Sequence, residues 1–186
     1  MAYPSDLKFL FDKASITLAV AESATAGNLS ARIASVSGAS TFFKGGAIVY
    51  NLDMKVKLLG VDREHAASCD CVSQQVARAM ASGVRDLCGS TVGVSVTGYV
   101  SPWSGNGVVV TEPFAWLGFN VNGHAWEKKV DVDPYASRVE VQRWYAADAI
   151  DGITKYLATY EPTPNTPISE YESLRLIYER LRTPSA

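Results

Sequence analysis

The stretch AESATAGNLSARIASVSGASTFFKGGAIVYNLDMK, residues 21–55, decides how this chain folds. It directly follows the apolar run ITLAV at residues 16–20, which is typical of a strand buried on both sides of a parallel or mixed sheet. A turn at residues 22–27 leads into a helical pattern at 28–35, which Ser37-Gly38 ends. A second strand is predicted over residues 42–50. Strands and helices therefore alternate from the start of the chain.

The rest of the sequence continues this alternation. Ser73 is expected to cap the clearest helix, which ends at Gly89. The dipeptide Asn122-Gly123 predicts the turn of an antiparallel hairpin. Further helices are predicted at residues 7–13, 53–59 and 134–160, further strands at 16–21, 91–97, 115–121 and 124–132, and loops at 61–72 and 98–112. The sum predicts a three-layer α/β/α sandwich with a mixed sheet of about five or six strands.

The composition changes after Tyr160. Residues 1–160 are expected to form one domain, and residues 161–186 a Pro-rich spacer followed by a C-terminal helix. The spacer has the sequence EPTPNTP, and the helix is expected at residues 169–182. This helix either packs on its own domain or contacts a partner.

Composition and charge exclude several classes of protein. Hydrophobic residues make up 47% of the 186 residues and charged residues 19%, which is typical of a globular protein. The net charge of −2 gives no basic footprint for nucleic acid. No apolar run has the roughly 20 residues of a membrane helix, and the N-terminus lacks the features of a signal peptide. We therefore expect a cytoplasmic protein without nucleic-acid or membrane partners.

The three cysteines, Cys69, Cys71 and Cys88, do not form the pattern of a disulfide framework. Cys69 and Cys71 could supply two metal ligands, and His65 lies in the same predicted loop. The chain has only two histidines and no second cysteine pair. We therefore predict that the cysteines are buried or surface thiols and that they form no metal site.

Several spaced motifs agree with one known family. They are AESATAG at residues 21–27, Gly38-Ala39-Ser40, the spacing of Gly46, Tyr50 and Lys55, and VSQQVARAMASG at residues 72–83. These elements resemble the C-terminal domain of CinA proteins, a family that includes nicotinamide-mononucleotide deamidases. The resemblance covers residues 5–160 and starts near the beginning of the chain, so the nucleotide-processing N-terminal domain of the family is expected to be absent.

The resemblance implies an activity. Members of this kind hydrolyse the carboxamide of nicotinamide mononucleotide, a pyridine nucleotide, to nicotinate mononucleotide and ammonia. It also implies a metal-independent amidohydrolase that needs no organic cofactor and is a homodimer.

Amide hydrolysis needs a nucleophile, a base and donors for the developing oxyanion. Ser40, which follows Gly38-Ala39, is the predicted nucleophile. Lys55 is the predicted base, provided that burial or nearby dipoles lower its pKa. Tyr50 would relay the proton or align the serine with the lysine.

The turn at residues 22–27 is the predicted binding site for the substrate phosphate, because a strand meets a helix N-terminus there. Ser23 and Thr25 would bind the phosphate or cap the helix. Glu22 is either a structural hydrogen-bond partner or an acceptor for a substrate hydroxyl. Arg143, like Arg138, either adds positive charge near the phosphate or lies on a solvated face. The predicted substrate-binding set is Glu22, Ser23, Thr25, Gly27, Gly38, Gly98 and Arg143.

The sequence departs from the family pattern in four places. Ala26 replaces a glycine, the usual glycine-rich loop becomes GYVSPWSG at residues 98–105, and PFAWL at 113–117 replaces the family's P-V-G-T-V. Gln142 stands where the last helix usually has an arginine. Tyr99 and Trp103 would narrow the loop, retune its substrate, or stack on a pyridine or purine ring.

Two other functions fit the same residues. The chain could be a nucleotide-binding or interaction protein that keeps the fold but has lost turnover. It could also be an amidase of unrelated small amides.

Overall fold

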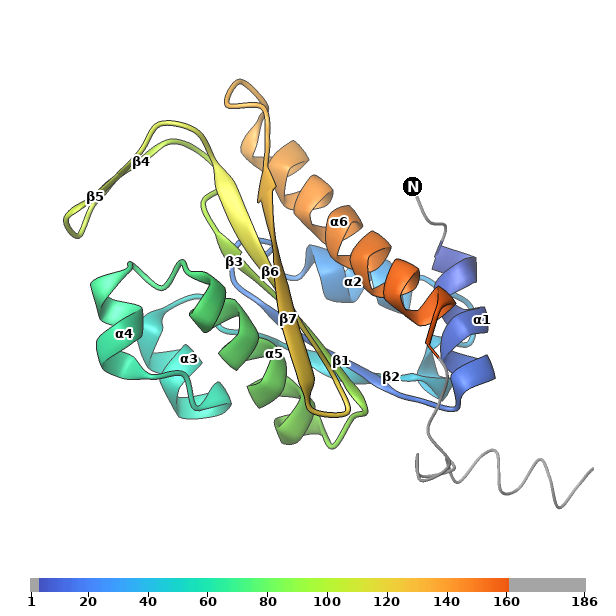
Figure 1. Cartoon of the computed structure of the whole chain (residues 1–186). Coiled ribbons are helices and arrows are strands. Elements are labelled where there is room, and N and C mark those ends of the chain that lie inside the picture. The colour runs from blue at the N-terminus through green and yellow to red at the C-terminus, as the bar shows by residue number, and fades with distance from the viewer. Residues whose placement is uncertain (1–3, 161–186) are drawn as a thin grey trace, which may run out of the picture.

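The computed structural model describes residues 4–160, which are built around a five-stranded mixed sheet (Figure 1). The strand order is β2-β1-β3-β6-β7. β1 (Leu18–Glu22) lies parallel to β2 (Phe43–Ile48) on one side and to β3 (Val92–Gly98) on the other. β6 (Phe114–Val121) runs antiparallel to β3 and to β7 (His124–Asp131). The predicted mixed sheet of five or six strands is confirmed.

Helices cover both faces of the sheet, which completes the predicted three-layer sandwich (Figure 1). A larger hydrophobic cluster lies under α1, α2 and α6, and a smaller one under α3, α4 and α5. Helices α1, α2 and α6 span Pro4–Ala14, Asn28–Ala34 and Arg138–Ala158. Helices α3, α4 and α5 span Leu52–Leu59, Arg63–Ser68 and Gln74–Cys88.

Helix α5 lies unusually close to the sheet because small residues face it. A Cβ atom added to Gly93 would lie 1.9 Å from the carbonyl oxygen of Ala81, and one added to Gly118 would lie 2.2 Å from that of Ala77. The hydroxyl of Ser95, the cross-strand partner of Gly118, donates to the Ala77 carbonyl at 2.7 Å. These contacts fix the height of α5 above β3 and β6.

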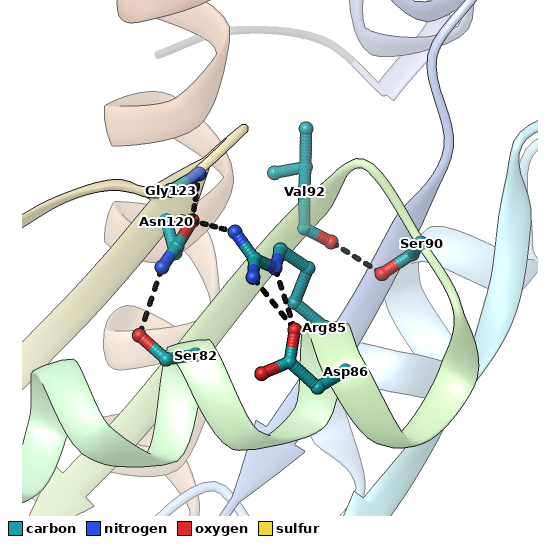
Figure 2. Close-up of polar contacts among 7 residues, drawn as sticks. All are labelled: Ser82, Arg85, Asp86, Ser90, Val92, Asn120 and Gly123. Carbon is teal, nitrogen blue, oxygen red and sulfur yellow. Dashed lines mark hydrogen bonds and ion pairs between the residues drawn. The ribbon is translucent and has the colours of Figure 1, made fainter. Parts of the chain in front are cut away.

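A polar network ties the same helix to the β6–β7 hairpin (Figure 2). The side chain of Asn120, only 3% exposed, donates to Ser82 Oγ at 2.8 Å. Its oxygen accepts from the Arg85 guanidinium and from the Gly123 amide, both at 2.9 Å. Because each of its polar atoms is satisfied, this buried amide specifies the register of α5 on the sheet without an unpaired group.

Two predicted loops contain regular structure. Residues 98–112 hold a hairpin of β4 (Trp103–Gly105) and β5 (Val108–Val110), and residues 61–72 contain α4. A short 3₁₀ helix, η1 (Ala39–Thr41), precedes β2. Helix α6 begins after Ser137, whose side chain and that of Glu140 form a capping box, and not at residue 134. The predicted spacer and C-terminal helix, residues 161–186, lie outside the described residues.

Within residues 4–160, no helix is both long and apolar enough to cross a membrane.

Replacing Gly118 by alanine tests the close approach of α5. The new methyl group would overlap the Ala77 carbonyl, and overpacking of this kind costs about 1–3 kcal/mol or more of unfolding free energy. Urea denaturation measures the loss. Gly60→Ala is the control, because nothing lies within 4 Å of the added carbon and only its left-handed backbone is strained, at about 1–2 kcal/mol. An unchanged urea midpoint for Gly118→Ala would contradict the packing described.

Candidate active site

A cavity of about 640 Å³ opens where β1 and β3 end. Its walls come from the turns after β1 and β2, from α4 and the segment behind it, from the β4–β5 hairpin and from the first residue of α6. Crevices at the carboxyl ends of parallel strands are the usual ligand sites of open α/β sheets. This cavity is therefore the candidate active site.

Lys55 and Ser23 form a buried pair at the base of this cavity. The Lys55 amine lies 2.9 Å from Ser23 Oγ and donates to the Val49 carbonyl oxygen, also at 2.9 Å. Lys55 is 1% exposed and Ser23 is 9% exposed. Ser23 follows β1, and Val49 follows β2. Two adjacent parallel strands thus bring the pair together, and Asn51, which caps α3, starts the helix that carries the lysine.

Burial lowers the pKa of Lys55, because desolvation penalises the charged amine. Cys71 and Asp70 lie near enough to oppose this effect in part. The two groups hydrogen-bonded to the amine, the Ser23 hydroxyl and the Val49 carbonyl, carry no net charge. A neutral Lys55 can keep its bond to Val49 and accept the Ser23 proton on its lone pair.

The backbone at Ala24 completes the arrangement. Ala24 lines the cavity directly after Ser23, and its amide has no hydrogen-bond partner within residues 4–160. A free amide next to a nucleophilic serine is a common oxyanion donor.

Of the two roles left open for Glu22, the hydrogen bonds of its carboxylate are those of the structural partner and not of an acceptor for a substrate hydroxyl. Its carboxylate accepts from the amides of Gly27, Leu29 and Ser30 at 2.7–3.0 Å, and from the Ser30 hydroxyl at 2.5 Å. The side chain is fully buried. Glu22 therefore supplies the anion at the N-terminus of α2, and the phosphate site predicted for this turn is already occupied by the chain itself.

The structure corrects the predicted pairing of Ser40 with Lys55. Ser40 is exposed in η1, at the beginning of β2, whereas Lys55 follows the end of that strand. Leu18, at the start of β1, lies beside this end of β2, because its amide donates to the carbonyl of Phe42. About five strand residues, or roughly 15 Å, separate Leu18 from Ser23 at the other end of β1. Ser40 therefore lies far from the Ser23–Lys55 pair. Gly38 lies at the same end of the sheet as Ser40, where it packs on Lys8.

Tyr50 lies in the cavity but does not bridge the serine and the lysine. Its hydroxyl accepts from the Arg138 guanidinium at 2.9 Å, and its side chain is 58% exposed. Arg138, the first residue of α6, also lines the cavity. Arg143 is exposed one turn further along this helix and does not line it, so the predicted role of Arg143 in substrate binding is not supported by its position.

The remaining predicted residues separate into two groups. Gly98 lines the cavity, and its missing side chain lets the β6 backbone approach. Gly27 caps α2 in a left-handed conformation and does not line the cavity. Thr25 is fully buried, also outside the lining, and its hydroxyl is the one buried side-chain polar atom without a partner among the described residues.

Sequence reasoning missed Asp70 and Asn106. One carboxylate oxygen of Asp70 accepts from Asn106 Nδ2 at 2.8 Å, and the other from the Tyr99 hydroxyl at 3.2 Å. Burial and the adjacent carboxylate raise the pKa of Tyr99, so it remains a donor. Asn106-Gly107 is a hairpin-turn signal that would have placed Asn106 at a strand connection.

In the part of the chain that the structure describes, no three or more His, Cys, Asp or Glu side chains are arranged to hold a metal ion. Cys69 and His65 do approach each other, at 3.9 Å between Sγ and Nε2.

Fold and site together define an α/β sandwich protein with a buried serine–lysine pair beyond the ends of parallel strands. The chain belongs to the CinA C-terminal domain family, whose model matches residues 4–157. A CinA-like protein of Myxococcus xanthus is 45% identical over 104 residues, which are 56% of this chain and 25% of that protein. A CinA-like protein of Acidobacterium capsulatum is 46% identical over 90 residues, or 48% of this chain and 22% of that protein. The chain thus matches only about a quarter of the length of these curated relatives.

Solved structures share the fold. The competence damage-inducible protein A of Klebsiella pneumoniae superposes with a TM-score of 0.78 at 23% identity, covering 86% of this chain and 97% of that one. The competence/damage inducible protein of Agrobacterium tumefaciens gives a TM-score of 0.72 at 24% identity, with 86% and 99% covered.

Glu22→Gln tests the structural role of this carboxylate. The variant presents an amide group to backbone amides that need an acceptor, and losing charged, buried hydrogen bonds should cost about 2–3 kcal/mol of unfolding free energy. Urea denaturation measures this cost. Glu140→Gln is the matched control, because Glu140 also caps a helix but is exposed, and its loss should be smaller. Equal losses in the two variants would contradict the role given to Glu22.

Proposed function

We propose that this protein is a metal-independent amidohydrolase that converts nicotinamide mononucleotide, or a close pyridine nucleotide, to nicotinate mononucleotide and ammonia. The observation that carries the proposal is the 2.9 Å contact between the buried Lys55 amine and Ser23 Oγ. Serine–lysine pairs perform nucleophilic catalysis without histidine. Membership of the CinA C-terminal domain family supports the substrate class.

The first half of the reaction forms an ester. Neutral Lys55 takes the proton of Ser23 while Oγ attacks the carboxamide carbon. The resulting oxyanion is stabilised by the amide of Ala24. When the tetrahedral intermediate collapses, the C–N bond breaks and the Lys55 ammonium returns its proton to the leaving nitrogen, which departs as ammonia.

The second half consumes one water molecule. Neutral Lys55 takes a proton from water, and the hydroxide formed attacks the ester carbon. Collapse breaks the bond to Ser23 Oγ, which recovers its proton from Lys55. The carboxylic acid so formed releases its proton to solvent to give the carboxylate product, and the free enzyme is restored.

The cavity suits a nucleotide better than a simple amide. Its volume of about 640 Å³ lies within the usual range for sites that hold drug-sized ligands. Arg138 lies in the cavity wall, and a guanidinium matches the geometry of a phosphate. We assign the phosphate to Arg138, because the N-terminus of α2 is occupied by Glu22.

Ser23→Ala and Ser40→Ala distinguish the two candidate nucleophiles. Loss of the nucleophile should lower ammonia release from nicotinamide mononucleotide by on the order of 10⁴-fold or more. We expect that loss in Ser23→Ala and near wild-type release in Ser40→Ala, measured with purified protein. Ammonia release that survives in Ser23→Ala would rule out Ser23. Thermal stabilisation of the wild type by the nucleotide, with no ammonia released, would indicate a binding protein instead.

The pH dependence of kcat/KM tests Lys55 as the base. The rate should rise with pH as Lys55 loses its proton, with a midpoint below the ordinary lysine pKa of about 10.4. Lys55→Arg should abolish this activity, because a guanidinium stays protonated. Lys57→Arg, exposed on the same helix, is the matched control and should retain the wild-type profile. Full activity in Lys55→Arg would contradict the assignment.

The same lowered pKa has a consequence for folding. Between the folded and the unfolded pKa of Lys55, the unfolded chain binds the proton that the folded protein has released. Unfolding free energy therefore rises with pH across that interval.

A further inference from the structure

The β4–β5 hairpin presents one face to the cavity. Asn106 and Gly107 both have left-handed backbones, with φ of 51° and 76°, as a tight two-residue hairpin turn requires. Trp103 pairs with Val110 across the hairpin, and both lie on the same face. Val110 is 8% exposed, whereas Val109 on the opposite face is 75% exposed. Figure 1 shows the hairpin extending away from the main sheet on the side of α3 and α4.

The indole ring of Trp103 is seated on its own hairpin. A Cβ atom added to Gly105, two residues along the same strand face, would lie 2.8 Å from Cζ2 and 3.3 Å from Cε2 of the ring. Glycine at this position therefore lets the ring lie against the backbone. The side chain stays 45% exposed and forms part of the cavity wall.

Asp70 fastens the hairpin at two points. Asn106 is at the tip and Tyr99 is at the base, and each donates to a different oxygen of this carboxylate. Asp70 and Cys71 both have positive φ angles, of 49° and 62°. The Cys71 amide holds this strained pair in place by donating to the Ala66 carbonyl at 2.7 Å.

We propose that Trp103 is the ring-binding wall of the cavity and that Asp70 is a positioning residue that holds it there. The ligand class is a flat, positively charged aromatic heterocycle, such as a pyridinium. An indole face attracts such a cation. The inference rests on the proposed function for the identity of the heterocycle, but binding to this wall does not require turnover.

Calorimetric binding of nicotinate mononucleotide tests this subsite. That compound has the pyridinium ring and the phosphate but no amide to hydrolyse, and ribose 5-phosphate is the matching ligand without the ring. Trp103→Ala should weaken nicotinate mononucleotide binding about tenfold and leave ribose 5-phosphate binding unchanged. Trp103→Phe should retain most of the affinity. Trp144→Ala is the control, because Trp144 is similarly exposed, at 40%, but lies outside the cavity wall.

Asp70→Ala tests the positioning role. It should weaken nicotinate mononucleotide binding in the same direction and speed amide hydrogen exchange over residues 108–110. Combining it with Trp103→Ala should weaken binding no further, because both changes act through the same ring.

Three results would overturn the inference: wild-type affinity in Trp103→Ala, equal weakening of both ligands, or no binding of nicotinate mononucleotide by the wild type. Ammonia release is a separate readout. Ring-dependent binding without ammonia release would leave the subsite standing and remove the proposed function. If the wild type releases ammonia and Trp103→Ala binds nicotinate mononucleotide with wild-type affinity, the proposed function stands and the subsite is removed.

Discussion

The burial of the Lys55 amine is the constraint on which the site depends. Removing an ammonium group from water is costly unless a charge or strong acceptors compensate, and the two groups bonded to this amine are a hydroxyl and a carbonyl. Burial therefore lowers the pKa of Lys55 and shifts the balance toward the neutral amine. In the proposed reaction, that cost is what would make Lys55 a base, and the packing of the surrounding turns maintains it.

Most of the layered fold could be predicted from the sequence, because alternating apolar runs and caps act locally. Ser73 and Gly89 define helix ends as expected. The hairpin at residues 103–110 was missed because its strands have only three residues each, too short for a periodic pattern. Helix α4 was missed for the same reason. It has six residues, and the cap at Asp62 is its main signal.

The site was predicted less well than the fold, because spacing along the chain does not show which strand ends meet. Ser40 lies 15 positions before Lys55 but at the opposite end of β2. Ser23 is twice as far away in sequence, and yet both it and the segment carrying Lys55 follow the ends of adjacent parallel strands. The family resemblance put Ser23, Ser40 and the Tyr50–Lys55 spacing in three separate motifs of one segment, residues 21–55. Only the topology showed which serine meets the lysine.

In the proposed reaction, charge determines how the nucleotide would lie in this cavity. A helix N-terminus after β1 is the usual place for a phosphate, but the Glu22 carboxylate takes up the free amides of α2 and would repel a second anion. The remaining cations in the wall are Lys55 and Arg138. If Lys55 is neutral for catalysis, Arg138 alone retains a positive charge. A phosphate at Arg138 then leaves the carboxamide for the serine, and the ring between these two points must lie along the wall formed by the β4–β5 hairpin.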